Sequence, residues 1–365
     1  MRSLEGVGRA VVVGAGIAGL ATGCALRGLG YEVCIFGREP ELRAEGAGLT
    51  LWPNATRVLG AIGLDHVIPA CARVLSEVVA LTPNGGVLSR LPMKKIRARF
   101  GPLVSVYRPE LLSALHEAFD GDVHFGTEVT LHNGRLRADG TPVRAGLIVG
   151  ADGIGSVVRQ LLAPEVVPRS AGYAAWRGVA ATGSTTPTRA SETIGRGMRF
   201  GLVPLTHDRT YWYAVLGEGD EADLGREFAD WHEPITSVLA ASRVGERSYL
   251  PLADLPPLPR WHRGNVVMVG DAAHAMTPNL GQGAAQALED VAALYRHLEN
   301  ASLPNALAAY VGERKRSAER IVARSRSAGR LAQASNPLAV RIRAAFMRRT
   351  PQAVAWRQLA SIIED

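Results

Sequence analysis

A glycine-rich turn between a short apolar strand and a helix lies near the start of this 365-residue chain. It reads V-V-V-G-A-G-I-A-G-L, with Gly14, Gly16 and Gly19 in the spacing G-x-G-x-x-G. The first glycine permits a tight turn, the second lets the backbone approach a pyrophosphate, and the third lets helix and strand pack closely. The sequence therefore predicts a mononucleotide-binding βαβ unit. Its elements are a strand over 10–13, a helix over 17–29 and a strand over 32–36.

A second glycine-rich segment, V-M-V-G-D-A-A-H-A-M-T-P-N-L-G-Q-G-A, occupies residues 267–284. A buried strand over 265–269 is expected to end at Gly270 and Asp271, and a helix is expected to open at about Gly281. An acid at a strand end and a helix N-terminus that directs N–H groups at an electron-rich ring both suit a dinucleotide with a redox ring. Together the two segments predict one cofactor site.

The composition limits the class of protein. With 47% hydrophobic and 21% charged residues and 40 glycines, the chain is typical of an α/β enzyme and not of a disordered or fibrous protein. Its length allows a large core and predicts two domains. The three cysteines form no C-x-x-C pair and no metal-ligand spacing, which indicates small buried residues in a reducing compartment. We expect a cytoplasmic protein without a metal ion.

The apolar run over 10–29 carries five glycines and Arg27. A buried βα unit fits this run better than a membrane span does. No other stretch reaches the roughly 20 apolar residues that a spanning helix needs. No membrane span is expected.

The net charge of +7 is concentrated near the C-terminus, where eleven Arg or Lys stand against two Glu between Glu313 and Arg349. This pattern favours amphipathic helices with solvated arginine faces. Attraction of an anionic cofactor such as NAD(P)H is the alternative interpretation. A nucleic-acid partner is not expected, because no interleaved aromatic residues or recognition motif accompany the charge.

Between the two glycine-rich segments the pattern changes from mixed helix and strand to mainly strand. The first part predicts a helix over 55–64 with Asn54 as N-cap, a hairpin over 76–91, a helix over 108–119, and strands over 123–131 and 147–149. The second part predicts strands over 173–180, 200–203, 210–216 and 246–250, with a helix over 224–239. A sheet domain is therefore predicted to be inserted into a discontinuous cofactor domain.

Three motifs carry a family resemblance: G-x-G-x-x-G at 14–19; G-A-D-G at 150–153 with Ser156 and Arg159; and G-D-A-A-H at 270–274 with Pro278 and G-Q-G at 281–283. Smaller matches are Gly46-Ala47-Gly48 before Trp52-Pro53-Asn54, Tyr107-Arg108-Pro109-x-Leu111, and Tyr173-x-x-Trp176-Arg177-Gly178. This set resembles the single-component FAD-dependent aromatic hydroxylases, flavoprotein monooxygenases built like p-hydroxybenzoate hydroxylase. The W-P-N and W-R-G elements resemble its compact urate, salicylate and 6-hydroxynicotinate hydroxylase branch.

The resemblance implies an α/β fold in which a Rossmann-like FAD domain of the glutathione-reductase type carries an inserted mixed or antiparallel-sheet substrate domain and C-terminal helices. The FAD domain with the C-terminal helices is expected over 1–75, 100–170 and 258–365. The substrate-binding sheet is expected over 76–99 and 171–257.

Carried over position by position, the resemblance implies a set of FAD contacts along the chain. Gly14, Gly16, Ala18 and Gly19 would hold the pyrophosphate, Arg108 the phosphate or ribityl chain, Val129 the adenine, and Asp271 the ribityl hydroxyls. Pro278, Gly281, Gln282, Gly283 and Ala284 would line the isoalloxazine. Gly48 also belongs to the set, and Asp152 belongs to a motif that serves both FAD and NAD(P)H. Arg108 as a surface cation and Asp152 as a turn-forming acid are the alternatives, and His274 is expected to be structural.

One position departs from the family pattern. The family usually places an acid at the end of the second strand for the adenosine ribose, and Gly37 stands there in this chain. Arg38 is the candidate contact to the adenosine moiety, and Glu39 would reach the ribose only after a local shift.

The resemblance implies that NADH or NADPH delivers a hydride to FAD, and that a flavin C4a-hydroperoxide formed with molecular oxygen hydroxylates or epoxidises an electron-rich aromatic or polycyclic small molecule. Arg199, Tyr211 and Tyr213 are the candidate substrate-orienting residues, with plain sheet packing as the alternative. An oxygen-independent flavin reductase or oxidase, a halogenase and a non-catalytic flavin-binding protein are the rival functions, although the W-x-W-x-I-P segment of halogenases is absent from the sequence. A monomer or homodimer is expected.

Overall fold

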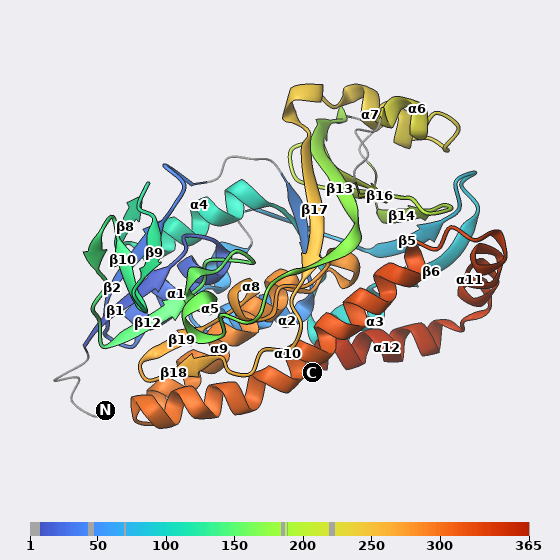
Figure 1. Ribbon diagram of the computed structural model, residues 1–365. Coiled ribbons are helices and arrows are strands. Elements are labelled where there is room, and N and C mark those ends of the chain that lie inside the picture. The colour runs from blue at the N-terminus through green and yellow to red at the C-terminus, as the bar shows by residue number, and fades with distance from the viewer. Residues whose placement is uncertain are drawn as a thin grey trace.

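The computed structural model describes residues 8–42, 47–68, 71–183, 187, 189–218 and 223–364. Its first sheet has six strands, and all pairs in it except β18–β19 are parallel (Figure 1). In spatial order the strands are β18 (His262–Arg263), β19 (Val266–Met268), β12 (Leu147–Gly150), β1 (Arg9–Val13), β2 (Glu32–Gly37) and β8 (Asp122–Phe125). The central strands are buried along nearly their whole length, which is why they appear in the sequence as continuous apolar runs.

Helix α1 (Ile17–Gly28) follows β1 and packs against α4 (Arg108–Phe119) and α9 (Gly283–Asn300). The predicted βαβ unit is therefore confirmed. Gly23 in α1 allows the close packing of α4, because a Cβ there would lie 2.7 Å from the Phe119 ring. The buried face of α4 carries the expected Leu111, Leu112, Leu115 and Phe119.

The second sheet has seven strands and is mixed, since β14 and β5 run parallel and the other pairs antiparallel. Its order is β17 (Ser248–Asp254), β13 (Arg169–Ala181), β16 (Arg209–Gly217), β15 (Arg199–Pro204), β14 (Ala190–Ile194), β5 (Glu77–Leu81) and β6 (Val87–Pro92). The predicted hairpin over 76–91 supplies β5 and β6. The architecture is the predicted α/β combination of a Rossmann-like domain with a mixed sheet.

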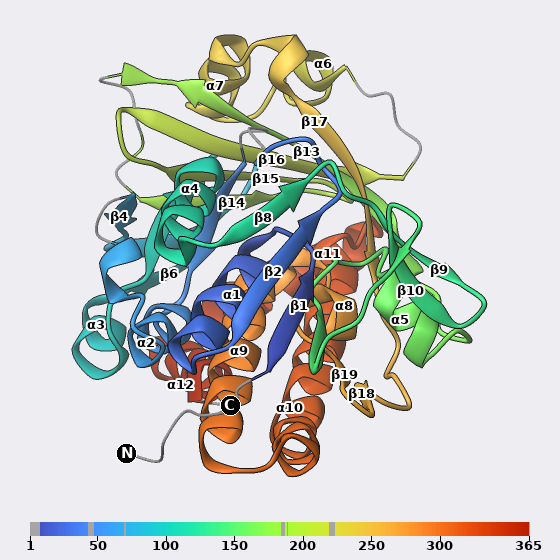
Figure 2. The same ribbon diagram turned by 90° about the vertical axis from the view of Figure 1, so that its left-hand side faces the viewer.

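The two faces of the second sheet have different partners. Trp212, Phe200 and neighbouring apolar side chains pack against α6 (Leu224–Glu227), Phe228 and α7 (Ile235–Ala241). Figure 2 shows these helices on the side of the sheet away from β1 and β2. Because side chains alternate along a strand, Tyr211 and Tyr213 lie on the opposite face, toward the first domain.

Two small three-stranded sheets complete the strands: β11 (Thr141–Pro142), β10 (Arg135–Ala138) and β9 (Val129–His132); and β3 (Gly48–Leu51), β7 (Val104–Tyr107) and β4 (Ala72–Val74). Four short helices lie between strands elsewhere along the chain: α2 (Pro53–Ala61), α3 (Lys94–Phe100), α5 (Val157–Leu162) and α8 (Asp271–His274).

Three helices end the chain: α10 (Leu303–Ala332), α11 (Pro337–Arg349) and α12 (Gln352–Glu364). Figure 1 shows α10 running diagonally across the molecule, from β18 of the first sheet toward the end at which α11 packs on β6. The predicted arginine-rich helices are thus present, although Arg314 and Arg343 are buried. None of the helices in the described ranges combines the length and the apolar character that crossing a bilayer requires.

Three sequence predictions were wrong in detail. The helix predicted over 224–239 is two short helices, because the chain turns at Pro234 between them. The strand predicted over 123–131 is β8 and β9, because Gly126 adopts a φ of +70° and sends β9 to a different sheet. Asn54 is not an N-cap: α2 begins at Pro53, and the Asn54 side chain is buried inside the fold. Gly46 lies outside the described residues.

The apolar cluster behind the second sheet gives a first prediction. Phe228 is fully buried and makes edge contacts with Phe200 and Trp231. We expect Phe228→Ala to lower the free energy of unfolding by about 3–5 kcal/mol, because it leaves a cavity among aromatic rings. Val244→Ala, at a side chain that is 76% exposed, should change it by no more than about 0.5 kcal/mol. Urea unfolding of both variants checks this, and equal losses would contradict it.

Candidate active site

The first glycine motif combines two close backbone approaches with one open position. A Cβ at Gly14, whose φ is +111°, would lie 2.3 Å from the carbonyl oxygen of Ala151, and a Cβ at Gly19 would lie 1.8 Å from that of Gly14. At Gly16, by contrast, no atom of the described chain lies within 4 Å of the Cβ position. Gly14 and Gly19 are thus required by packing, and Gly16 faces open space.

The N-terminus of α1 is free to bind an anion. Gly16 is its N-cap, and no side chain in the described part of the chain caps it. The first N–H groups of a helix point along its axis and carry partial positive charge, so an uncapped terminus with open space in front of it suits a pyrophosphate. Ala18 lies in this first turn.

The second glycine motif meets the first at Gly270. This residue has a φ of +60°, and a Cβ on it would lie 3.3 Å from the Cβ of Ala18 and 3.0 Å from that of Ala287 in α9. The two segments lie more than 200 residues apart in the chain and are in contact in the structure, as a shared site requires. The 150–153 motif joins them through the contact between Ala151 and Gly14.

Asp271 is the first residue of α8 and directly follows Gly270. The side chain is solvent-accessible, yet enough protein surrounds it that burial raises the pKa of the carboxyl, while His274 and Arg108 act in the opposite direction. Arg108, the first residue of α4, is thus near enough to Asp271 for electrostatic coupling. An accessible carboxylate in a recess is suited to accept hydrogen bonds from ligand hydroxyls.

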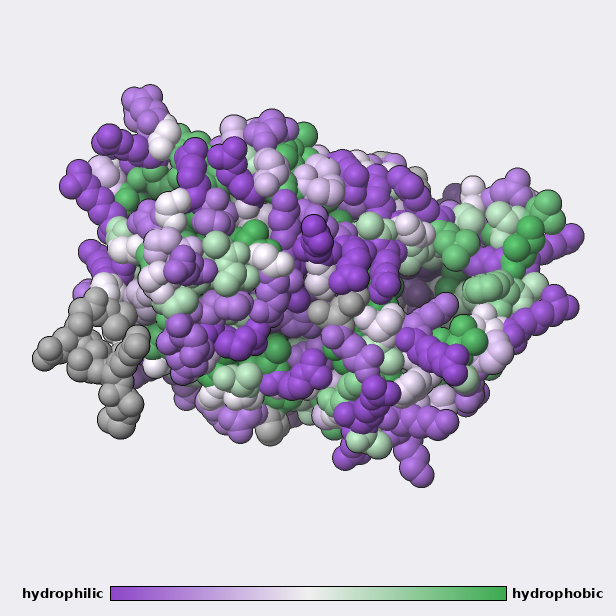
Figure 3. All heavy atoms as spheres, turned by 90° about the horizontal axis from the view of Figure 1, so that it is seen from below, coloured by the Kyte–Doolittle hydropathy of each residue, from purple (hydrophilic) through white to green (hydrophobic). Residues whose placement is uncertain are grey.

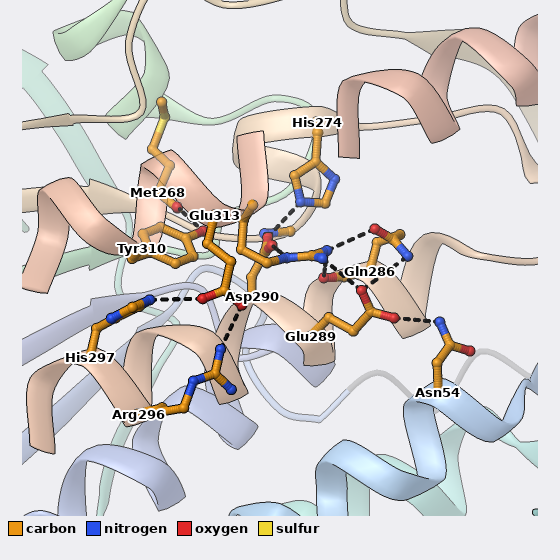
Figure 4. A network of polar contacts seen from close by, with 12 residues as sticks. Asn54, Met268, His274, Gln286, Glu289, Asp290, Arg296, His297, Tyr310 and Glu313 are labelled. Carbon is orange, nitrogen blue, oxygen red and sulfur yellow. Dashed lines mark hydrogen bonds and ion pairs between the residues drawn. The ribbon is translucent and has the colours of Figure 1, made fainter. Parts of the chain in front are cut away.

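A buried ionic network joins α9 to α8 and α10 (Figure 4). The carboxylate of Asp290 accepts hydrogen bonds from Gly270 N at 2.8 Å, His274 Nε2 at 2.5 Å and Arg314 Nε at 2.9 Å. Burial alone would raise the pKa of Asp290, but His274 and Arg314 hold it below the ordinary value. His274 is therefore structural in this arrangement, as predicted from the sequence.

The network continues to the start of α9. Glu289 pairs with Arg314 at 2.7 Å and accepts a hydrogen bond from Asn54 Nδ2 at 2.5 Å. Asn54 Nδ2 also donates to Gln282 Oε1 at 3.0 Å. Gln282 Nε2 and Asn54 Oδ1 are both buried and have no hydrogen-bond partner among the described residues. Buried amide groups are rarely left unpaired in proteins, so this pair points to a polar ligand beside Gln282.

The loop before α9 contacts strand β3 and Trp52, the residue that follows this strand. Gly281 adopts a φ of +62°, and a Cβ there would lie 3.1 Å from Trp52 Nε1 and 3.2 Å from Thr50 Oγ1. Pro278 begins the single helical turn before Gly281, and Gly283 and Ala284 open α9. The residues predicted to line the isoalloxazine are thus side by side on one loop and helix start.

Asp152, unlike Asp271, binds the backbone of the protein itself. Its Oδ2 accepts hydrogen bonds from the backbone N–H groups of Val157 at 2.7 Å and Val158 at 3.3 Å, at the start of α5. Its Oδ1 is buried and unpartnered within the described ranges, and burial raises the pKa of the carboxyl. Its observed role is the turn-forming one; contact with FAD or NAD(P)H stays a prediction.

The adenosine end is shaped by Gly37. A Cβ at Gly37 would lie 3.0 Å from Ala15 and 3.4 Å from the Phe125 ring, so a side chain at this position would meet close neighbours. Arg38 is exposed and pairs with Glu39 at 3.2 Å. Backbone hydrogen bonds from Gly126 to Glu39 and from Thr127 to Gly37 bring the start of β9, and thus Val129, to this end.

On the second sheet Arg199 is buried and held by three side chains. Its guanidinium donates to Gln333 Oε1 at 3.0 Å, Glu192 Oε1 at 3.1 Å and Asn279 Oδ1 at 2.8 Å. Asn279 follows Pro278 in the loop before α9. Arg199 therefore joins the substrate-side sheet to the flavin-side loop and to the end of α10.

Tyr213 and Tyr211 lie on the same face as Arg199. Tyr213 crosses Gly201, where a Cβ would lie 2.0 Å from its ring, and its hydroxyl donates to Glu192 Oε1 at 3.1 Å. Tyr211 packs on Gly48, whose Cβ would lie 2.5 Å from that of the tyrosine. Both residues are half-buried, and burial raises the pKa values of their phenols. The candidate substrate residues thus converge on the flavin-side elements.

Sequence reasoning missed Glu192, Asn279, Gln333 and the role of Asn54. Asn279 and Asn54 stand within quoted motifs and were open to prediction. Glu192 and Gln333 sit in an ordinary strand and at a helix end, so no local pattern distinguishes them.

The residues present fit an FAD molecule: an uncapped helix N-terminus for its pyrophosphate, a recessed acid for its hydroxyls, and unpaired amide groups beside the predicted ring position. Bound FAD would be held by the βα turn of β1 and α1, by Asp271, and by the loop from Pro278 to Ala284.

Comparisons with known proteins agree with this geometry. The family model described as an FAD binding domain matches residues 9–325. The chain is 36% identical over 357 residues to an aurachin C monooxygenase/isomerase of Stigmatella aurantiaca, covering 93% of each protein. It is 33% identical over 364 residues to a 2-heptyl-3-hydroxy-4(1H)-quinolone synthase of Pseudomonas aeruginosa, covering 94% of each. Klebsiella pneumoniae HpxO, solved with FAD and uric acid, has the same fold, with a TM-score of 0.88 at 23% identity over 98% of this chain and 96% of that one.

The glycine motif gives a prediction with a built-in control. We expect Gly16→Ala to leave the free energy of unfolding within about 1 kcal/mol, since its methyl group enters open space, and to weaken FAD binding about tenfold or more by blocking the pyrophosphate. Gly19→Ala should instead destabilise the apoprotein by several kcal/mol, because its methyl group meets the Gly14 carbonyl. FAD titration and apoprotein unfolding separate the two effects; unchanged FAD affinity in Gly16→Ala would refute the assignment.

The Asp290 network gives a pH prediction. A carboxyl with a lowered pKa stabilises the fold above its unfolded pKa, near 4, and loses that contribution as the pH falls through the folded pKa. We expect Asp290→Asn to cost about 3–5 kcal/mol at pH 7, and the difference from the parent to shrink below about pH 4.

The exposed pair of Glu313 and Arg296 is the matched control. Glu313→Gln should cost no more than about 1 kcal/mol. Urea unfolding as a function of pH measures both variants; a pH-independent loss in Asp290→Asn would contradict the ionic interpretation.

Proposed function

Because this chain belongs to the family of FAD-dependent aromatic monooxygenases, we propose that it uses NADH or NADPH and molecular oxygen to hydroxylate a neutral bicyclic heteroaromatic ring that bears an N–H group, of the quinolone class. One oxygen atom enters the ring and the other leaves as water, while NAD(P)H and a proton are consumed. Bound FAD supplies the redox chemistry that accepts the hydride and activates oxygen.

The state of Arg199 carries the proposal about charge. Its guanidinium is buried and already donates to Glu192, Asn279 and Gln333. An arginine whose charge is neutralised by a carboxylate, with two amide oxygens on its other nitrogens, offers little to an anionic substrate. A neutral ring is therefore the better fit to this face of the sheet.

Glu192 supports the proposal about the N–H group. Its side chain is 29% exposed, on the same face as Tyr213, and one oxygen serves both Arg199 and the Tyr213 phenol. Its second carboxylate oxygen is an acceptor suited to a ring N–H, and a charge-assisted hydrogen bond of this kind orients a ring strongly. Tyr213, donating to Glu192, positions that carboxylate.

The relatives point to the same chemistry. Two of those found are named for aurachin C and for a 4(1H)-quinolone, and others act on urate, 6-hydroxynicotinate and 3-amino-4-hydroxybenzoate by name. All are named as monooxygenases, hydroxylases or a hydroxyquinolone synthase, which favours oxygenation over an oxygen-independent reductase or a non-catalytic flavin-binding role.

The other residues have roles in binding and orientation. The backbone of Gly14, Gly16 and Gly19 and the N-terminus of α1 would hold the pyrophosphate, with Arg108 and Asp271 along the ribityl chain. Gln282, with its unpaired Nε2, would donate to the polar edge of the ring system. The packed aromatic side chains of Trp52 and Tyr211 would exclude water from the space between loop and sheet.

We further infer a cytoplasmic monomer or homodimer, with an FAD domain over 1–75, 100–170 and 258–365 and a substrate domain over 76–99 and 171–257. Three free cysteines support a reducing compartment, and burial raises the pKa of both Cys24 and Cys71 to about 11, which keeps them inert.

The substrate assignment is tested with paired ligands. We expect a 2-alkyl-4(1H)-quinolone to stimulate NAD(P)H oxidation and to gain one oxygen atom by mass, whereas urate and salicylate, which are anionic, do neither. The N-methylated quinolone, which lacks the N–H, should bind about tenfold more weakly, as judged by perturbation of the flavin absorbance.

Glu192→Gln then identifies the acceptor. It should weaken binding of the N–H quinolone about tenfold, since a neutral amide is a weaker acceptor than a carboxylate, and leave binding of the N-methyl compound nearly unchanged. Equal losses for both ligands would refute the contact, and turnover of urate but of no quinolone would refute the substrate class.

A further inference from the structure

Helix α11 exposes an apolar stripe. Leu338, Ile342 and Phe346 follow one another at four-residue spacing and are 65%, 61% and 63% exposed. Residues four apart lie on one face of a helix, so these side chains form a continuous stripe over more than two turns. Leu331, at the end of α10, is 55% exposed as well. Single exposed leucines are common on proteins, but an ordered stripe of three large side chains is not.

The opposite face of α11 anchors the helix, so the stripe cannot turn inward. Arg343 is buried and donates to the backbone carbonyls of Leu331, Ala332 and Gly195. At the N-terminus, Asn336 accepts hydrogen bonds from Leu338 N at 2.9 Å and Ala339 N at 3.2 Å. Both contacts fix the rotation of the helix about its axis.

Positive charge surrounds the stripe. Arg341, Arg348 and Arg349 are exposed on the same helix. Between residues 320 and 363 the sequence contains nine arginines and neither Asp nor Glu. Figure 3 shows hydrophobic residues gathered at the end of the molecule where Figure 1 places α11, with hydrophilic residues around them.

We propose that α11 is a docking surface for an anionic lipid bilayer. The helix would lie in the plane of the interface, with Leu338, Ile342 and Phe346 inserted below the headgroups and Arg341, Arg348 and Arg349 against lipid phosphates. The 13-residue helix is far too short to span a bilayer, so the association is peripheral and reversible. This surface stands on α11 alone and does not depend on which ring the enzyme hydroxylates.

A second copy of the chain fits this surface less well. A two-fold contact through α11 would bring the arginines of both copies together, and like charges at short range repel. Three side chains also offer much less than the roughly 800 Å² per partner that a stable dimer buries. The combination of apolar and cationic groups is complementary to an anionic membrane surface and not to itself.

The test uses the full-length, FAD-loaded enzyme and sedimentation with vesicles. Vesicles of phosphatidylglycerol and phosphatidylcholine in equal parts should bind the enzyme, and vesicles of phosphatidylcholine alone should bind it at least about tenfold more weakly. Binding should decline with added salt, because exposed charges are screened. Absence of binding to the anionic vesicles would overturn the proposal.

A double variant assigns the binding to the stripe. Ile342→Glu with Phe346→Glu should reduce vesicle binding about tenfold or more, while FAD content and turnover of a soluble substrate stay at the parental level. The matched control, Val167→Glu with Val244→Glu, places the same two charges at exposed valines away from α11. Apart from the effect of the lower net charge, it should change vesicle binding by no more than about twofold relative to the parent.

Equal binding by the α11 variant and the control variant would overturn the assignment. Light scattering tests the remaining alternative, which is self-association through α11. If the parent is a dimer, the α11 variant is a monomer and neither binds vesicles, the surface is an interface between two copies of the chain and the membrane proposal is overturned.

Discussion

The site depends on backbone segments that approach more closely than any side chain would allow. Gly14 lies against Ala151, Gly19 against Gly14, and Gly270 between Ala18 and Ala287. The contact of Gly19 with Gly14 closes the first motif on itself, and the contacts of Gly14 and Gly270 bring the other two motifs against it, because these positions have no Cβ. What remains open is the space in front of Gly16 and the N-terminus of α1, where a phosphate is best stabilised.

Next to this backbone framework, a buried ionic network holds α8, α9 and α10 in place. Asp290 binds the Gly270 amide, His274 and Arg314 at once, and Glu289 extends the network through Asn54 to Gln282. A buried charge is tolerated only when it is fully paired, which makes the register of α9 against α8 and α10 highly specific. Through Asn54 and Gln282 the same network also fixes the start of α9.

The second sheet is attached to this framework by polar contacts and not by apolar packing alone. Its outer face is closed by α6 and α7 around Trp212 and Phe228, while its inner face carries Arg199, Glu192 and Tyr213. The hydrogen bond from Arg199 to Asn279 joins that inner face to the loop before α9. Arg199 therefore connects the second sheet to the loop before α9 and to the end of α10, and its guanidinium is already bound to Glu192, Asn279 and Gln333.

The sequence by itself determined the elements whose signal is local. The βαβ unit, the acid after β19 and the helix at Gly283 each follow from glycine spacing and apolar runs, because turns and helix starts are set by neighbouring residues. Tertiary structure alone decided that β8 and β9 belong to different sheets and that Asn54 is buried in an ionic network. It also decided that the Arg199 guanidinium donates hydrogen bonds to Glu192 and Gln333. Those partners lie up to 235 residues apart, and no periodicity within a short window records a contact over that separation.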